Sequence, residues 1–118
     1  MSVSRPFGVP KLKSTHVKGA FCLALWVLGG FAHADPLALA QEKHCLSFHA
    51  IDHKVVGPAY RDVAKRYAMD AQANARLSEK VMRGGAGSWG VVPMPANNQV
   101  SPEQAHELVD WILKQKSP

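Results

Sequence analysis

Cys45-Leu46-Ser47-Phe48-His49 is the stretch from which the fold of this chain can be predicted. It differs by one residue from C-x-x-C-H, the sequence that attaches a c-type haem. In that motif the two thiols add to the haem vinyl groups, and the histidine presents a ring nitrogen to the iron. Cys45 and His49 stand at the matching positions, while Phe48 replaces the second thiol. Taken alone, the pattern also fits a buried free thiol beside a histidine that ends a helix.

A second candidate iron ligand is Met94, which lies in Pro93-Met94-Pro95, far from His49 in the sequence. A thioether is a soft, neutral ligand, and a proline on each side restricts its backbone. Paired with histidine, it raises the iron potential and closes the sixth coordination site to oxygen and peroxide. Met94 alone could equally be a loop methionine that fills the core. Together with His49 it favours a His/Met haem site.

Four short helices are predicted, and their start and stop signals are of the usual kinds. The first helix begins at Asp35-Pro36, and the second covers 59–68. The third runs from beyond Asp70 to Gly84, and the last begins with the capping box Ser101-Pro102-Glu103-Gln104. On the last helix the apolar residues Ala105, Leu108, Val109, Ile112 and Leu113 repeat at intervals of three and four, with Trp111 beside them. Because no alternating strand pattern or internal repeat occurs, the predicted fold class is all-α.

The segment from Gly84 to Val100 is 17 residues long and contains no charged residue. Loops of that length in small domains are usually functional or disordered. Burial of Trp89, Val91, Val92 and Met94 is expected, which argues against disorder. A small four-helix domain also buries little surface, and such domains commonly need a staple. A large apolar cofactor held between the first helix and this loop would supply one.

The N-terminal 34 residues have the pattern of a secretory signal peptide. Four basic residues precede an uncharged apolar run of 14 residues, which ends in Ala32-His33-Ala34. The run is shorter than the roughly 20 residues that span a bilayer, although an uncleaved membrane anchor is the alternative. Cleavage after Ala34 would leave residues 35–118 as one domain in the periplasm, without stable membrane insertion.

Charge and cysteine usage narrow the function classes. Of 14 basic residues, the ten beyond residue 34 face all nine acids, so the formal charge of that part is about +1. A nucleic-acid-binding domain would carry a clustered basic face instead.

Cys22 leaves with the signal peptide, so Cys45 has no partner for an intrachain disulfide. The basic residues between 43 and 83 are either an ordinary solvated surface or a cationic collar that steers acidic partners. His53 and His106 are expected to be solvated.

From Asp35 to its C-terminus the chain resembles the small bacterial class I cytochromes c, short single-haem carriers that serve nitrite reductases and oxidases. The stretches that carry the resemblance, besides the Cys45 and Met94 segments, are Ala50-Ile-Asp, Lys54-Val-Val-Gly-Pro-Ala-Tyr60, Trp89-Gly90, Val92-Pro-Met-Pro95 and Trp111-Ile-Leu. The resemblance implies about four short helices wrapped around one haem, with a long methionine-bearing loop.

The resemblance also implies roles for single residues. His49 would be the proximal and Met94 the distal iron ligand, with Cys45 forming a thioether. The carbonyl of Pro58 would accept a hydrogen bond from the other ring nitrogen of His49 and fix its tautomer. Three further residues would surround the haem: Trp89 would reach a propionate, Lys80 would occupy a position often held by a propionate-pairing arginine, and Asn97 would steady the Met94 sulfur.

Two departures from the family pattern matter. Phe48 leaves at most one thioether, and it bears on maturation because the attachment machinery normally recognises two thiols. His44 stands where the family usually has glycine, so its bulk could crowd the helix or offer a spare ligand. Three outcomes stay open: haem c with one thioether, non-covalent haem b, or no haem. The first is preferred.

The expected function is electron transfer rather than catalysis. The sequence offers no nucleophile–base pair, carboxylate dyad or phosphate loop, and two protein ligands leave no open iron site. The expected redox partners are a nitrite reductase, a terminal oxidase or a quinol-oxidising complex. The protein is expected to be a monomer that contacts them through the charge-free loop. The alternative is a haem-binding module that acts as a sensor, in haem transfer or as a weak peroxidase; copper binding by the thiol, histidines and methionine is also open.

Overall fold

The computed structural model describes residues 2, 4, 7–15, 19, 29–30 and 34–116. The chain divides into two units, Met1–Phe31 and Ala32–Pro118. Most of the apolar run of the predicted signal peptide, including Cys22, lies outside the described residues. No helix in the described part is long and apolar enough to cross a membrane. The second unit contains all the described helices and is the one considered below.

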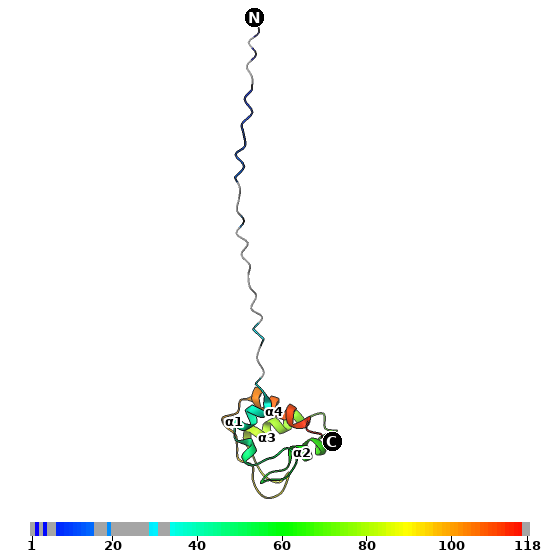
Figure 1. The fold of residues 1–118 in the computed structure, drawn as a ribbon. Helices are drawn as coiled ribbons and strands as arrows, with labels where there is room; N and C mark the ends of the chain where they lie inside the picture. The colour runs from blue at the N-terminus through cyan, green and yellow to red at the C-terminus, as the bar shows by residue number, and fades with distance from the viewer. Residues whose placement is uncertain are drawn as a thin grey trace. The chain divides into compact units, whose positions relative to one another are not determined.

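Four α-helices and one 3₁₀ turn make up this unit (Figure 1). They are α1 (Pro36–Glu42), the 3₁₀ turn Cys45–Ser47, α2 (Tyr60–Arg66), α3 (Ala73–Arg83) and α4 (Pro102–Leu113). The described residues form no strand, only one isolated antiparallel bridge between Gly85 and Met94. The all-α class predicted from the sequence is therefore confirmed.

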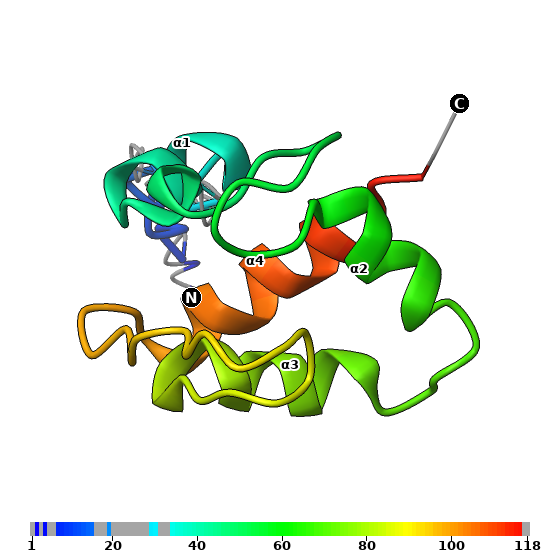
Figure 2. The same ribbon diagram turned by 90° about the horizontal axis from the view of Figure 1, so that it is seen from below.

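The central element is α4, which contacts α1, α2 and α3 (Figure 2). Its start is the predicted capping box: the backbone N–H of Gln104 donates to Ser101 Oγ at 3.2 Å, and Ser101 N–H donates to Gln104 Oε1 at 3.1 Å. Its predicted apolar face is buried at Ala105, Leu108, Val109 and Ile112. Because three neighbouring helices pack on it, α4 is the element on which the rest of the fold is assembled.

Two apolar clusters attach the other helices to α4. In the larger one, Leu39 and Ala40 of α1 and Val81 of α3 pack with Val100 and the first turns of α4. In the smaller one, Tyr60 and Val63 of α2 pack on Ile112. Each helix thus contributes only two to four buried side chains. A core of that size is what made a staple expected from the sequence.

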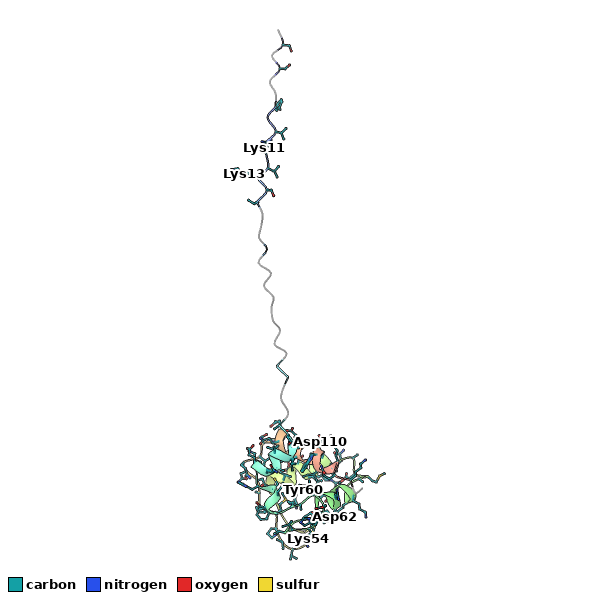
Figure 3. All side chains as sticks on the ribbon, viewed as in Figure 1. Lys11, Lys13, Lys54, Tyr60, Asp62 and Asp110 are labelled. Atoms are coloured by element: carbon teal, nitrogen blue, oxygen red, sulfur yellow. The ribbon has the colours of Figure 1, made fainter. Side chains whose placement is uncertain are left out.

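A polar contact that the sequence did not predict joins α3 to α4. Ser78 is buried, and its hydroxyl lies 3.2 Å from Asn74 Oδ1 and 3.1 Å from His106 Nδ1. Asn74 Nδ2 donates to Asp110 Oδ1 at 2.6 Å and to the carbonyl of His106 at 3.1 Å. His106 is exposed, as expected, but it also satisfies a buried hydroxyl between the helices. Asp110 can be located in Figure 3.

The helix bounds differ from the predictions at the first two helices. The second helix was predicted over 59–68 but ends at Arg66, where Tyr67 caps it. The first was predicted to lead into Cys45, yet α1 ends at Glu42 because His44 adopts φ 59°, in the left-handed region. Within the described residues His44 is the only non-glycine residue with a positive φ. The side chain is exposed and borders the cavity described below.

Replacing His44 with glycine is expected to stabilise the protein by about 0.5–1 kcal/mol, because the left-handed conformation strains a residue with a Cβ. The gain is only partial, because glycine also increases the conformational entropy of the unfolded chain. Thermal or denaturant unfolding measures the change. The matched control is His53→Gly, at an exposed position without positive φ, where glycine should lower stability slightly. Equal losses in both variants would contradict the strain at His44.

The long loop was expected to bury its apolar side chains; three of them are exposed to differing extents, and all three line the cavity described below. Trp89 is 40% exposed, Val91 91% and Val92 63%. The loop is held through its backbone instead: Gly87 N–H donates to the carbonyl of Gly90 at 2.8 Å, and Gly85 and Met94 exchange a pair of hydrogen bonds. Backbone pairing orders the segment while leaving apolar side chains at its surface.

Candidate functional site

A cavity of about 1090 Å³ opens between the segment that carries His49 and the loop that carries Met94. In Figure 2 these segments, green and yellow, lie on opposite sides of α4. Cys45, His49 and Met94 all line the cavity. Its remaining wall includes apolar side chains of three helices: Val63, Leu77, Val81, Leu108, Val109 and Ile112. The volume is at the upper end of that found for ligand and cofactor sites, and the lining suits a large apolar group with a few polar anchors.

The His49 ring is held on two sides. Its Nδ1 lies 2.8 Å from the carbonyl oxygen of Pro58. Because a carbonyl only accepts, Nδ1 is the nitrogen that donates, and in the neutral ring Nε2 is the nitrogen with the lone pair. The ring also stacks on Tyr60, with centroids 5.2 Å apart and planes 21° apart. Tyr60 is buried, which raises the pKa of its hydroxyl, and its ring meets Trp111 edge-on at 5.5 Å (Figure 3 labels Tyr60).

Gly57 leaves room for the His49 ring. A Cβ on Gly57 would lie 2.4 Å from His49 Cε1 and 2.8 Å from Nδ1. The backbone at this position is fixed as well, because the N–H groups of Val56 and Gly57 both donate to the carbonyl of Phe48, at 3.2 and 2.8 Å. Gly57 was not among the site residues predicted from the sequence, although a Gly-Pro pair eight residues after the histidine is a visible signal. This glycine is part of the histidine site.

Gly57→Ala is expected to displace the His49 ring and to destabilise the protein by about 1–3 kcal/mol, the usual effect of overpacking. Two measurements test this: thermal unfolding, and the NMR signal of the His49 Nδ1 proton, which should shift or exchange faster once the hydrogen bond to Pro58 is disturbed. An unchanged melting temperature together with an unchanged proton signal would contradict the role assigned to Gly57.

Met94 is fixed by its own backbone. Its N–H donates to the carbonyl of Gly85 at 3.0 Å, and its carbonyl accepts from the Gly85 N–H at 2.9 Å. Gly84 ends α3 with φ +70°, and a Cβ there would lie 2.3 Å from the Met94 oxygen. The close approach of α3 to the methionine therefore requires glycine at 84. The Met94 side chain itself is half-buried.

Asn97 holds the loop to the end of α3. Its side-chain Nδ2 donates to the carbonyl of Val81 at 2.9 Å and to that of Pro95 at 3.4 Å. Its backbone N–H also donates to the end of α3. Asn97 therefore joins the loop that carries Met94 to the end of α3, and its predicted role at the Met94 sulfur stays a prediction. The link forms because the last carbonyls of α3 lack helical partners and Asn97 supplies one.

Trp89 and Lys80 both line the cavity, Trp89 from the loop and Lys80 from α3. A contact of Trp89 with Arg66 was not predicted from the sequence. The Arg66 guanidinium lies 4.6 Å from the centre of the Trp89 ring, and it also donates to the carbonyl of Ser88. A cation over an aromatic face and a hydrogen bond on the adjacent residue together anchor this part of the loop to α2.

Cys45 is a half-buried free thiol on the 3₁₀ turn. Burial raises the pKa of the thiol, so it is protonated at neutral pH. In the part of the chain that the structure describes, no three side chains of His, Cys, Asp or Glu gather as a group that could hold a metal ion. The cavity lining holds the three donors predicted for a haem, the Cys45 thiol, the His49 imidazole and the Met94 thioether, and the imidazole of His44 as well. That donor set suits covalent attachment and iron ligation of a haem.

The basic residues lie in more than one place. Lys43, Lys54, Arg76 and Lys80 border the cavity, and Lys43 pairs with Glu42 at 2.9 Å. Arg61 and Lys65 line a separate groove on α2. Lys54, on the loop before α2, is labelled in Figure 3.

The sequence of the chain is similar to those of several known proteins. Cytochrome c-551 of Pseudomonas aeruginosa is 48% identical over 82 residues, which cover 70% of this chain and 78% of that protein. Cytochrome c2 of Rhodocyclus tenuis is 53% identical over 88 residues, 70% of this chain and 95% of that protein. Cytochrome c-552 of Nitrosomonas europaea is 41% identical over 98 residues, 83% and 94% respectively. No protein-family model matches the chain.

Solved structures that resemble this chain are cytochromes c as well. The crystal structure of wild-type Nitrosomonas europaea cytochrome c552 superposes with a TM-score of 0.66 at 42% identity, covering 68% of this chain and 99% of that one. Class 1 cytochrome MtoD from Sideroxydans lithotrophicus ES-1 gives 0.61 at 34% identity, covering 70% and 94%. These similarities do not favour a sensor or a haem-transfer module. The chain belongs to the small class I cytochromes c, the single-haem electron carriers.

Proposed function

We propose that this chain carries single electrons between respiratory redox proteins in the periplasm, using one haem held by His49, Met94 and a single thioether at Cys45. The observation that carries the proposal is the convergence of these three side chains on one cavity from two segments far apart in sequence. Export by the predicted signal peptide and cleavage after Ala34 are part of the proposal. Nitrite reductases, terminal oxidases and quinol-oxidising complexes are the partner classes.

The residues present fit a haem. The unprotonated Nε2 of His49 is the nitrogen free to bind iron, because Nδ1 is used by Pro58. Met94 has its backbone fixed by Gly85, and a thioether is the soft ligand that favours ferrous iron. Trp89 and Lys80, which line the same cavity, are the donors proposed for the propionates. Asn97 supports the site through the loop backbone.

The bound haem supplies a ferrous/ferric couple, and the chain supplies the rest. The Pro58 carbonyl keeps the imidazole in one tautomer, and the stacked Tyr60 limits rotation of its ring. Apolar side chains of α3 and α4 exclude water from the cavity wall. A fixed ligand geometry and a dry wall change little between the two oxidation states, which favours fast outer-sphere transfer. The exposed, charge-free loop with Val91 and Val92 is the proposed docking patch. Small transient interfaces suit such encounters.

The proposal of a single thioether rests on the position of Phe48. Phe48 is the residue next to His49 and lines the cavity with 43% of its surface exposed. It therefore stands where C-x-x-C-H has its second thiol and can only pack against the bound group. Cys45 is the one cysteine left to form a covalent bond.

Cys45→Ser is expected to abolish covalent attachment of haem. The test is export of the full chain in a bacterium with a haem-attachment system, followed by haem staining of the periplasmic protein after denaturing electrophoresis. The matched control is Cys22→Ser, which changes the other cysteine and should leave staining unchanged because Cys22 is removed with the signal peptide. Haem that stays bound under denaturing conditions in Cys45→Ser would overturn the assignment.

A further inference from the structure

The loop from Gly84 to Val100 is held at its base by hydrogen bonds that its tip does not share. Gly85 and Met94 exchange a pair of backbone hydrogen bonds there, and Asn97 donates to the carbonyl of Val81 on α3. These contacts hold the segment next to Met94 against the end of α3. The position of the loop tip depends on a different contact.

The loop tip, residues 86–92, is joined to a helix by one side chain. Arg66 is the last residue of α2, and its Nη1 donates to the carbonyl of Ser88. Its guanidinium also lies 4.6 Å from the centre of the Trp89 ring. Within residues 34–116, the one other hydrogen bond of the tip lies inside the tip itself. Arg66 is therefore the polar link between the tip and the helices.

Arg66 supports the cavity wall from outside. It does not line the haem cavity, whereas Trp89 and Tyr67 both do. The guanidinium lies 5.8 Å from the centre of the Tyr67 ring as well, within the distance at which a cation and an aromatic face attract each other. Arg66 forms no ion pair with any described residue, so no carboxylate competes for its charge. One cation thus contacts two aromatic residues of the wall.

The helix α2 contacts both sides of the cavity. Its first residue, Tyr60, stacks on the His49 ring, and its last residue, Arg66, holds the tip of the loop that carries Met94. Seven helical residues form a stiff spacer about 10 Å long. Because α2 is also packed on α4, the contacts of Arg66 fix the loop tip relative to the histidine side of the cavity.

We propose that Arg66 is a positioning residue that keeps the loop tip closed over the cavity and holds Trp89 where its indole N–H reaches a haem propionate. The proposal rests on the proposed function, in which Trp89 is a propionate donor. Arg66 does not line the cavity, so it acts through Trp89 and not on the haem itself. Arginine suits this role because its planar group stacks on a ring and still donates to a carbonyl beside that ring.

Amide hydrogen exchange of the haem-containing protein, purified from the periplasm, tests the closure of the tip. Arg66→Gln is expected to speed exchange of the Gly87 N–H about tenfold, because both contacts of the tip with α2 are lost. Exchange of the Met94 N–H at the loop base and of the Leu108 N–H in α4 should change less than twofold. Equal acceleration at Gly87 and Leu108 would mean a general loss of stability and would overturn the proposal.

Two further variants test the chemistry of the contact. Arg66→Lys keeps the charge but not the planar group, and is expected to speed exchange at Gly87 only about threefold. Lys65→Gln is the matched control, because it removes a charge from the neighbouring exposed residue of α2, which does not contact the tip. It should change the exchange less than twofold. An effect of Lys65→Gln as large as that of Arg66→Gln would overturn the role of Arg66.

Reduction potentials test the link from Arg66 through Trp89 to the haem. Trp89→Phe keeps a ring under the guanidinium but removes the indole N–H. It is expected to lower the potential, because a propionate without its donor favours ferric iron. Arg66→Gln should lower it too, but by less than half as much when it is made in the Trp89→Phe variant. Equal shifts in both backgrounds would mean that the charge of Arg66 acts directly, and would overturn the positioning role.

The two measurements separate this proposal from the proposed function. A protein without haem would contradict the proposed function, and exchange at Gly87 would still decide whether Arg66 closes the tip. A haem-containing protein in which Arg66→Gln leaves both the exchange and the potential unchanged would overturn the role of Arg66 alone.

Discussion

Met94→Ala is expected to lower the reduction potential by on the order of 0.1–0.3 V, within the roughly 0.8 V range that axial ligands control. Loss of the thioether removes the ligand that stabilises ferrous iron and opens the sixth coordination site. Cyanide, which the unaltered protein should not bind at neutral pH, is then expected to bind rapidly. Redox titration and cyanide-binding spectra measure the two effects.

The chain offers a matched control for that variant. Met69 is 97% exposed and does not line the cavity, so Met69→Ala removes the same side chain without touching the proposed site. It should leave the potential and the resistance to cyanide unchanged. If Met94→Ala behaved like Met69→Ala in both measurements, Met94 would not be an iron ligand.

Gly84→Ala is expected to destabilise the protein by about 2–4 kcal/mol, from left-handed strain and steric overlap together. The added Cβ would lie 2.3 Å from the Met94 oxygen and 2.7 Å from Ala96 N, both backbone atoms that cannot move without opening the loop. For a domain of this size the melting temperature should fall by at least roughly 10 °C. Thermal unfolding followed by circular dichroism measures it.

Gly87→Ala separates the two contributions to that loss. Gly87 also has a positive φ, +98°, but nothing lies within 4 Å of a Cβ built there. This variant should show the backbone strain alone, about 1–2 kcal/mol. Similar losses in both variants would mean that contact between α3 and the Met94 segment does not contribute.

Much of the fold could be predicted because its signals are local. The capping box at Ser101 and the apolar repeat from Ala105 to Ile112 each act within one or two helical turns, and both are present as predicted. Asp35 likewise caps α1, accepting from the Leu37 N–H at 3.2 Å. Gly84 ends α3 for the reason that glycine usually ends helices. Local hydrogen bonds and periodicity are sufficient for these features.

The remaining features depend on contacts between distant segments. Gly57 was not singled out because its reason is the position of the His49 ring, and Arg66 because its partner Trp89 lies 23 positions away. The loop side chains were predicted buried from their hydrophobicity, but backbone pairing at Gly85 and Met94 decides their exposure. The hydrogen bonds of the Asn97 side chain to the carbonyls of Val81 on α3 and Pro95 in the loop were not predicted either, because they too join distant segments.

The central claim is a single covalent bond between Cys45 and a haem whose iron is held by His49 and Met94. Its most direct test is a pyridine haemochrome spectrum of the protein purified from a periplasmic preparation. We predict an α band between the positions for b-type haem and for haem with two thioethers. A b-type band would contradict the covalent bond, and a protein without haem would contradict the electron-carrier function of this polypeptide.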